Sequence, residues 1–285
     1  MRPSQPTRRP ETARSRDDRE ERLETPSAEE LDVMERHLAA LPVHSGGRAD
    51  MDRETGVLLI RADPPGQGLD YAAAVRWSGD EWAARLADVQ RRARQEDRWP
   101  SLLVADGLTR PTDLAVRLAD AGWTKLVGET TLWARRPATV PHLDPSLRLE
   151  AVTERTAADH EDLERGIFGL PAWSSTARLE GLTAGVRDGS LRAFLIRSSG
   201  APVAVARLSL RGGSAGLYGI GVRPDRRRQG LGGLVTAIAM RAALARGGRL
   251  VWLSVEDGNT AARTLYERLG FQPGFGWSRW MAPSR

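Results

Sequence analysis

An internal repeat limits the possible folds of this 285-residue chain more than any other feature of its sequence. SLLVADG at 101–107 resembles WLSVEDG at 252–258, and AVRLADAGW at 115–123 resembles RTLYERLGF at 263–271. Self-similarity of this kind indicates one structural unit that occurs twice. We therefore expect two copies of a unit of roughly 130 residues, one in each half of the chain.

Hydrophobic patterns predict the elements of each copy. In the first copy, strands are expected over 56–62, 69–77, 101–107 and 128–135, and helices after Ser27, over 80–95 and over about 112–121. In the second copy, a strand at 147–153 leads into two helical segments, with Thr156 as a possible N-cap of the first. Three strands, a long helix, a strand at 250–256, a last helix and a final strand follow. This order is typical of an α/β fold with a mixed sheet.

Composition places the domain boundaries. Residues 1–26 are charged and contain almost no apolar side chains, so we expect a disordered tail there. Residues 136–146 carry three prolines and are expected to link a first domain at 27–135 to a second domain at 147–285.

The composition also excludes several kinds of chemistry. The absence of cysteine excludes disulfides and thiol catalysis, and the four histidines are too scattered for a metal site. The net charge is only +5, with 37 acidic residues mixed among 42 basic ones, which does not favour a nucleic-acid partner. No apolar run is long enough to span a membrane. We expect a cytoplasmic monomer or homodimer without metal, membrane or nucleic-acid partners.

The stretch VRPDRRRQGLGG at 222–233 places four arginines before three glycines, at the start of an apolar helical run. The first turn of a helix has unpaired N–H groups and a partial positive charge, which together stabilise an anion. Glycine lets these N–H groups approach a phosphate closely, because it has no Cβ. The stretch predicts a phosphate-binding site, with an ordinary charged surface turn as the alternative.

Two motifs resemble those of the GNAT superfamily of acyl-CoA-dependent N-acyltransferases. RRQGLG at 227–232 fits the pattern Q/R-x-x-G-x-G/A, and NTAARTLYERLGF at 259–271 resembles N-x-x-A-x-x-L-Y-x-x-x-G-F. The resemblance covers about 146–285. In the first copy, Pro111 and Leu118 stand where Asn259 and Tyr266 stand in the second, and WSGDEW replaces the glycine-rich loop. The resemblance therefore implies tandem GNAT-like domains, of which the first is a degenerate, non-catalytic copy.

The resemblance also implies a reaction and a cofactor site. The second domain is expected to be an acetyl-CoA-dependent N-acetyltransferase, in which a small-molecule or peptide amine attacks the thioester directly. The backbone of Ile220 and Val222 would hold the pantetheine arm, and Tyr266 would donate a proton to the leaving sulfur. The full set of residues implied in binding coenzyme A is Ile220, Gly221, Val222, Arg227, Arg228, Gln229, Gly230, Leu231, Gly232, Gly233, Asn259, Ala262 and Tyr266.

The base that takes the proton of the amine is open, because the strand AGLYGIGV has no carboxylate where many relatives have a glutamate. Tyr218 is a candidate relay, since strand alternation predicts that it shares a face with Ile220 and Val222. Glu256, Asp257 and a water molecule are alternatives.

Aromatic residues suggest an acceptor pocket. Phe168 and Trp173 lie in GIFGLPAWSS, where relatives line this pocket, and Trp277 is a candidate from the opposite side. Interdomain packing is the alternative for all three. The G-x-S-x-G pattern at 212–216 is expected to be a hairpin turn, because strands flank it on both sides.

A protein of a different class, a catalytically inactive CoA-binding or regulatory module, is the alternative function. Two expectations follow from the preferred one. Valine at positions 230 and 232 should abolish acetyl-CoA binding and leave the fold intact. The first half expressed alone should not bind coenzyme A.

Overall fold

The protein forms one continuous mixed sheet. The computed structural model describes residues 25–62, 70–140, 142 and 144–283, so most of the predicted disordered tail lies outside the described residues. Among the described residues the strand order is β1-β2-β3-β4-β11-β5-β10-β9-β8-β7-β6. The strands are β1 (Arg48–Asp52), β2 (Val57–Arg61), β3 (Tyr71–Ala73), β4 (Ser101–Ala105), β5 (Thr124–Ala134), β6 (Leu147–Ala151), β7 (Leu191–Ser198), β8 (Ala201–Arg211), β9 (Ser214–Val222), β10 (Leu250–Glu256) and β11 (Gln272–Met281).

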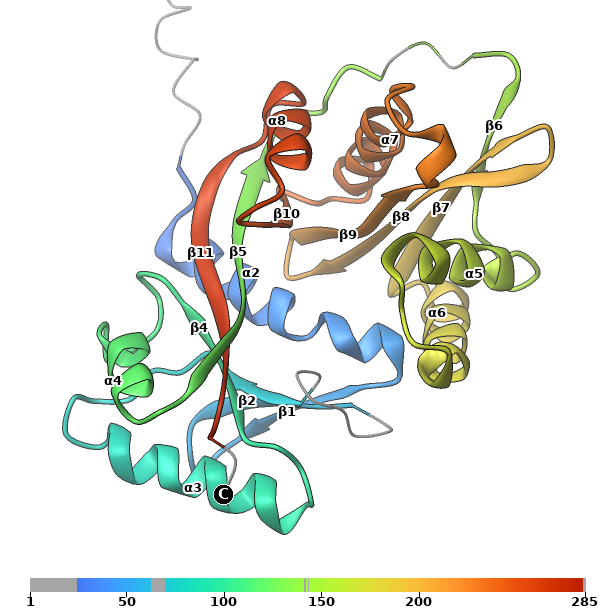
Figure 1. Ribbon diagram of the computed structural model, residues 1–285. Helices are drawn as coiled ribbons and strands as arrows, with labels where there is room; N and C mark the ends of the chain where they lie inside the picture. Colours follow the sequence, from blue (N-terminus) through green and yellow to red (C-terminus); the bar gives the residue numbers. More distant parts are fainter. Residues whose placement is uncertain (1–24, 63–69, 141, 143, 284–285) are drawn as a thin grey trace, which may run out of the picture.

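Helices cover both faces of this sheet (Figure 1). The helices are α2 (Ala28–Ala39), α3 (Trp82–Gln95), α4 (Leu114–Asp120), α5 (Ala157–Phe168), α6 (Ser175–Asp188), α7 (Leu231–Ala245) and α8 (Thr260–Arg268), with 3₁₀ turns η1 (Leu41–Ser45), η2 (Ala172–Ser174) and η3 (Pro224–Arg226). In the described chain, no helix is long and apolar enough to cross a membrane.

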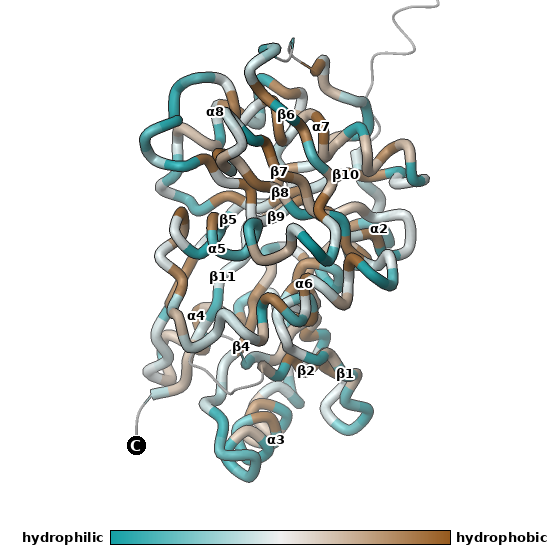
Figure 2. Tube along the Cα trace, turned by 90° about the vertical axis from the view of Figure 1, so that its right-hand side faces the viewer, coloured by the Kyte–Doolittle hydropathy of each residue, from teal (hydrophilic) through white to brown (hydrophobic). Residues whose placement is uncertain are grey.

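Alternation along the strands assigns each helix to a face. On β4, Leu103 packs with α2, whereas its neighbour Leu102 packs with α3 and α4. On β8, Val205 packs with α5 and α6, whereas Leu208 packs with α7. Successive strand residues point to opposite faces. The first face therefore carries α2, α5 and α6, and the second carries α3, α4, α7 and α8. Hydrophobic positions are concentrated on inner strands such as β7 and β8 (Figure 2).

The last strands of the two halves are interleaved. Strand β11, from the second half, pairs antiparallel with β4 and with β5 of the first half. Strand β5 in turn pairs with β10 of the second half, with Val251 opposite Ala134 and Glu256 opposite Glu129. Figure 1 shows β5 and β11 running side by side through the centre of the molecule. At the centre of the sheet, a strand of the second half (β11) therefore lies between two strands of the first half, and β5 of the first half lies between two strands of the second.

The internal repeat is visible in the order of elements. The first half runs β3-α3-β4-α4-β5, and the second runs β9-α7-β10-α8-β11. Gly122 and Gly270, on which the two copies align, both follow the helix of their copy and both have positive φ, 79° and 88°. Glycine is the residue that adopts this conformation without strain. The mixed α/β class predicted from the sequence is confirmed.

Many local predictions agree with the structure, but strand β1 (Arg48–Asp52) was not predicted, and two further predictions differ in detail. Ser27 caps α2 in a capping box with Glu30, and Gly212 and Gly213 form the predicted hairpin turn. The strand expected over 69–77 is too long, because Ala74 adopts a φ of 54° and ends the extended chain. Thr156 stands at the cap position of α5, but its hydroxyl accepts from the backbone N–H of Thr153 (3.0 Å) and does not cap the helix.

Candidate active site

A gap opens in the sheet between β9 and β10. The two strands pair only from Ser214 to Leu217 and from Leu250 to Leu253, although β9 continues to Val222 and β10 to Glu256. Beyond Leu217, β9 keeps its pairing with β8 and has no strand partner on the side of β10 among the described residues. Backbone groups on that side are therefore available to a ligand.

A bulge in β9 changes which side chains face the gap. Gly219 has a φ of 57°. Between the pairs Val205–Gly221 and Arg207–Tyr218, β9 contains one more residue than β8. An extra residue on one strand reverses the alternation beyond it. The prediction that Tyr218 shares a face with Ile220 and Val222 is therefore wrong. Tyr218 packs on the side of α5 and α6, whereas Ile220 and Val222 pack on the side of α7.

An open cavity of about 570 Å³ occupies this gap and reaches both faces of the sheet. Asn259, Ala262 and Tyr266 line it from α8, which covers the second face. Phe168, Trp252 and Trp277 line it from the first face. A ligand in the cavity could therefore be reached from either side of the sheet.

The start of α7 lies next to the cavity and is open to an anion. Gly230 has a φ of 78° and no side chain caps the helix. The N–H groups of Leu231, Gly232 and Gly233 have no acceptor among the residues that the structure describes. A helix start of this kind binds phosphate groups. The residues present therefore fit a diphosphate such as that of coenzyme A.

The four arginines of the loop have different partners. Arg223 and Arg226 both pair with Asp225. Arg227 lines the cavity and donates from Nε to the backbone carbonyl of Val222 (3.2 Å). Arg228 is exposed, with a φ of 64°, and forms no ion pair with any described residue. The charges of Arg227 and Arg228 are therefore available to an anion at the helix start.

Gly232 and Gly233 also have a packing role, in addition to the N–H groups that they offer at the helix start. A Cβ at either position would lie 3.3 Å from the side chain of Leu265 on α8. These two glycines therefore allow α7 and α8 to pack closely.

Tyr266 brings a phenol into the gap. Its side chain is only 7% exposed and makes an edge-to-face contact with Phe271, at 6.1 Å between ring centroids. Burial raises the pKa of Tyr266 to about 12. Its hydroxyl donates to no residue in the described part of the chain, so a ligand in the cavity could accept from it.

Asn259 is held in place by the helix that follows it. Its Oδ1 accepts from the backbone N–H of Ala262 (3.1 Å) and caps α8. The amide nitrogen of the same side chain is left for the cavity, which Asn259 lines. The cap and a ligand contact are compatible.

The three predicted acceptor-pocket aromatics are not all at the cavity. Phe168 lines it and is 47% exposed. Trp277 lines it too, with its indole N–H donating to Ser254 (3.0 Å). Trp173 is 56% exposed on η2 and does not line the cavity, because the turn at η2 directs it to the surface.

The first half lines part of the cavity, which the sequence did not indicate. Leu38, Leu41 and Pro42 reach it from α2 and η1, and Tyr71 and Glu129 reach it from β3 and β5. None of these residues stands in a recognisable motif, and only the interleaved strands and the path of α2 bring them to the second half.

Tyr218 has a partner from the first half. Its hydroxyl lies 2.9 Å from Nδ1 of His44, and the two rings stack. Burial raises the pKa of the Tyr218 phenol and lowers the pKa of His44. Arg207 beside them is fully buried and forms an ion pair with Glu164 of α5. This group therefore ties η1 of the first half to β8, β9 and α5.

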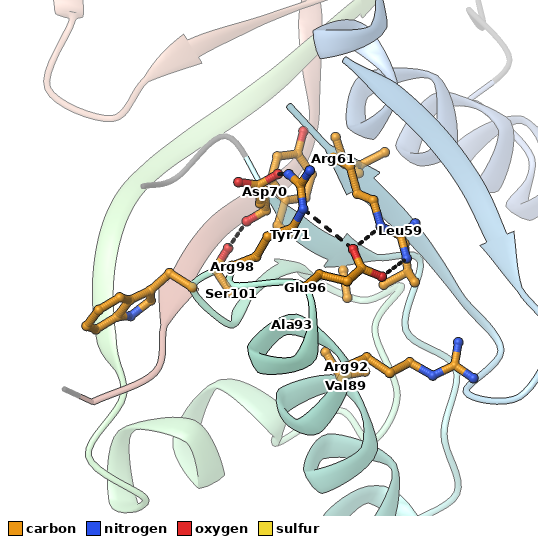
Figure 3. Close-up of a pocket in the computed structure, with 13 residues that line it drawn as sticks. Leu59, Arg61, Asp70, Tyr71, Val89, Arg92, Ala93, Glu96, Arg98 and Ser101 are labelled. Atoms are coloured by element: carbon orange, nitrogen blue, oxygen red, sulfur yellow. Dashed lines mark hydrogen bonds and ion pairs between the residues drawn. The ribbon is translucent and has the colours of Figure 1, made fainter. Parts of the chain in front are cut away.

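A second cavity lies between β2, β3 and α3 (Figure 3). Its charged groups are paired with one another: Arg61 donates from Nε to Glu96 (2.6 Å), and Arg98 pairs with Asp70 and with Glu96. These ion pairs occupy the charged groups named here and leave them little capacity for a ligand.

Comparison with known proteins agrees with this geometry. Residues 154–271 match the model of the acetyltransferase (GNAT) family, so this part of the chain is a domain of that family. The match ends at Phe271 and includes the α7 start and Tyr266.

Two kinds of curated relative are similar to parts of the chain. A mycothiol acetyltransferase from Clavibacter sepedonicus is 34% identical over 128 residues, which are 43% of this chain and 38% of that protein. A ribosomal protein bS18-alanine N-acetyltransferase from Escherichia coli is 37% identical over 78 residues, 27% of this chain and 53% of that protein. The chain thus covers only about two fifths to one half of the length of these two relatives.

Solved structures share the fold of nearly the whole chain. A GCN5-related N-acetyltransferase from Kribbella flavida superposes with a TM-score of 0.67 at 23% identity, over 88% of this chain and 96% of its own. A tandem GNAT protein from the clavulanic acid biosynthesis pathway gives 0.60 at 18% identity, over 91% and 97%. The expected tandem GNAT-like fold is confirmed.

Proposed function

We propose that this protein is an acetyl-CoA-dependent N-acetyltransferase that acts on an amine. The observation that carries the proposal is the cavity through the sheet, which begins beside an uncapped helix start and has the phenol of Tyr266 in its wall. The GNAT domain at 154–271 supports the same reaction class.

The second half would bind acetyl-CoA with its backbone. The N–H groups of Leu231 to Gly233, with Arg227 and Arg228 beside them, suit the diphosphate. The unpaired edge of β9 at Ile220 and Val222 suits the amides of pantetheine, and Asn259 offers its free amide nitrogen. Gly221 and Gln229 belong to the same stretch of chain and are included in the proposed coenzyme A site.

Tyr266 would protonate the leaving sulfur. Acetyl-CoA supplies an acyl thioester, whose cleavage expels a thiolate with an ordinary pKa of about 8.5. With a pKa of about 12, the phenol of Tyr266 stays protonated at neutral pH and can donate to that sulfur. General acid catalysis of this kind typically contributes ~10²–10⁴-fold in rate.

The acceptor would be a small-molecule or peptide amine that enters from the first face of the sheet. Phe168 and Trp277 give this side of the cavity apolar walls, and Tyr71 of the first half adds a third ring. The curated relatives are named for acetylating mycothiol or a ribosomal protein alanine, which supports an amine of either kind.

A CoA-binding regulatory module is the second candidate. The observation that favours it is the absence of a carboxylate on β9, where Tyr218 is engaged with His44. Such a module would bind acetyl-CoA without turning it over.

Titration calorimetry and thiol release separate the two candidates. Wild-type protein is mixed with acetyl-CoA and one amine at a time. The amines are a peptide with an N-terminal alanine, glucosamine and spermidine. Free thiol is then measured with a colorimetric reagent. The chain has no cysteine, so the reagent reports only coenzyme A. We expect binding, and turnover with at least one amine. Tyr266→Phe should keep the affinity and lose ~10²-fold or more in kcat. Binding without turnover would favour the module, and no binding would contradict both.

A further inference from the structure

We propose that Glu129, on strand β5 of the first half, is the general base that takes the proton of the acceptor amine. This inference rests on the proposed acetyltransferase function and assigns the residue that the second half lacks. It also gives the first half a part in catalysis.

The interleaved strands place Glu129 at the cavity. Glu129 lies opposite Glu256 of β10 on one side and opposite Trp277 of β11 on the other. Residues directly opposite in antiparallel strands point to the same face. Glu129 therefore shares its face with Trp277, and both line the cavity that Tyr266 lines through the gap.

The carboxylate of Glu129 is free to receive a ligand. It forms no ion pair and no hydrogen bond with any residue in the described ranges, although it is half-buried. Arg279 is a cation on its face that acts on it, and the Arg279 guanidinium lies over the ring of Tyr71 at 5.9 Å from the centroid. A half-buried carboxylate without a partner is costly to keep charged, which suits a group that binds a proton.

The charges around Glu129 suit a base near neutrality. Burial raises the pKa of Glu129 to about 7, and the negative charges of Glu256 and Asp257 act in the same direction, while Arg279 opposes them. An efficient general base has a pKa near the working pH. The groups that face or adjoin it are Glu256 and Asp257 from the end of β10, Arg279 from β11, Tyr71 from β3, Arg227 across the cavity, and Lys125 on the opposite face of β5.

Tyr218 is less suited to this role. Burial raises the pKa of its phenol, so at neutral pH it cannot accept a proton, and its hydroxyl is already paired with His44. A relay through Tyr218 would have to pass its proton to His44, whose pKa burial lowers. Glu129 needs no such relay.

The step balances in protons and electrons. Glu129 takes one proton from the bound ammonium, and the freed nitrogen lone pair forms a bond to the thioester carbonyl carbon. The carbon–sulfur bond breaks, and its electron pair leaves with sulfur, which takes a proton from Tyr266. The nitrogen loses its second proton as the amide forms, and this proton restores Tyr266. Glu129 then releases its proton to solvent, so each acetyl transfer releases one proton.

The test is the pH dependence of acetyl transfer by the full chain. For wild type, kcat/KM with the best amine of the panel should rise through about pH 7 and level off above it. Glu129→Gln should lose ~10²-fold or more at the plateau and lose this rising limb, with unchanged affinity for acetyl-CoA. Glu129→Asp should keep the limb at reduced rate.

Matched variants make the result specific. Glu267→Gln, an exposed glutamate on α8, controls for loss of charge, and Tyr218→Phe tests the rival relay. A Glu129→Gln protein with wild-type rate and pH profile would overturn this inference and leave the proposed function standing. A wild type that binds acetyl-CoA but acetylates no amine would overturn both.

Discussion

Single residues decide the proton chemistry of this site. Tyr266 is buried and Glu129 is half-buried, and burial raises the pKa of each, to about 12 and about 7. The phenol is thereby kept as a proton donor, and the carboxyl is brought to the point where it can exchange a proton near neutral pH. The two groups approach one cavity from opposite faces of the sheet and from different halves of the chain.

The raised pKa of Glu129 has a consequence for stability. In the folded protein this pKa is about 7, against 4.5 for an unperturbed glutamate, so the folded state holds the proton more tightly. The stabilisation of the folded state by protonated Glu129 is fully present below about pH 4.5, and it is lost as the pH rises through about 7. We expect Glu129→Gln to be more stable than wild type at about pH 8, by up to about 3 kcal/mol, and no more stable at about pH 4. Urea denaturation at both pH values measures this difference. Equal stability of the two proteins at about pH 8 would show that Glu129 is solvated.

At the start of helix α7, glycine stands at position 230 because of the backbone conformation there and not because a side chain would lack space. A Cβ at Gly230 would meet nothing within 4 Å, so space does not explain this glycine; its φ of 78° does. At Gly232 a Cβ would lie 3.3 Å from the side chain of Leu265, so the contact with α8 leaves little room for a larger residue. These two positions argue against the expectation that valine at 230 and 232 leaves the fold intact, because a β-branched residue is strained at positive φ and a larger side chain at 232 would press on α8.

A gentler pair of substitutions tests the helix start. Gly230→Asn should bind acetyl-CoA within a few-fold of wild type, since asparagine tolerates the left-handed region. Gly230→Val should bind at least ~10-fold more weakly, because relief of the strain would move the N–H groups of the first turn. Titration calorimetry gives both affinities. Gly232→Ala reports the α7–α8 contact separately, through thermal stability. Undiminished affinity in Gly230→Val would place the diphosphate elsewhere.

In the molecule as a whole, the two halves complete each other. Strand β11 lies between β4 and β5, and the core around Trp133 contains Trp252 and Trp277 of the second half. Helix α2 of the first half also packs against the second half, where His37 lies 2.7 Å from the hydroxyl of Ser209. Cutting the chain at the connector would expose this core and leave unpaired strand edges.

We therefore expect that residues 27–135 and 147–285, each expressed alone, do not fold cooperatively, and that coexpression restores a stable complex. For the same reason, a lack of coenzyme A binding by the isolated first half would be uninformative. Thermal unfolding followed by near-ultraviolet circular dichroism distinguishes folded from unfolded halves. A sharp transition in either isolated half would mean that its own strands close the sheet.

Local sequence predicted much of this molecule. The capping box at Ser27, the hairpin at Gly212 and Gly213, and the helix start at Gly230 are each encoded within a few residues, so they can be predicted without tertiary information. The bulge at Gly219 could not be predicted, because a glycine within a strand pattern does not reveal whether it adds a residue to the pairing. Simple alternation therefore placed Tyr218 on the wrong face.

Residues close together in the chain were enough to define the kinds of element, their order, the repeat and the motifs at 227–232 and 259–271, because each depends on periodicity and local backbone preferences. Folding in three dimensions was needed to interleave β5 with β11 and to separate β9 from β10. It was also needed to bring Glu129 to the cavity and His44 to Tyr218. Strand order and the burial that shifts a pKa arise from contacts between residues far apart in the chain, and no local pattern records them.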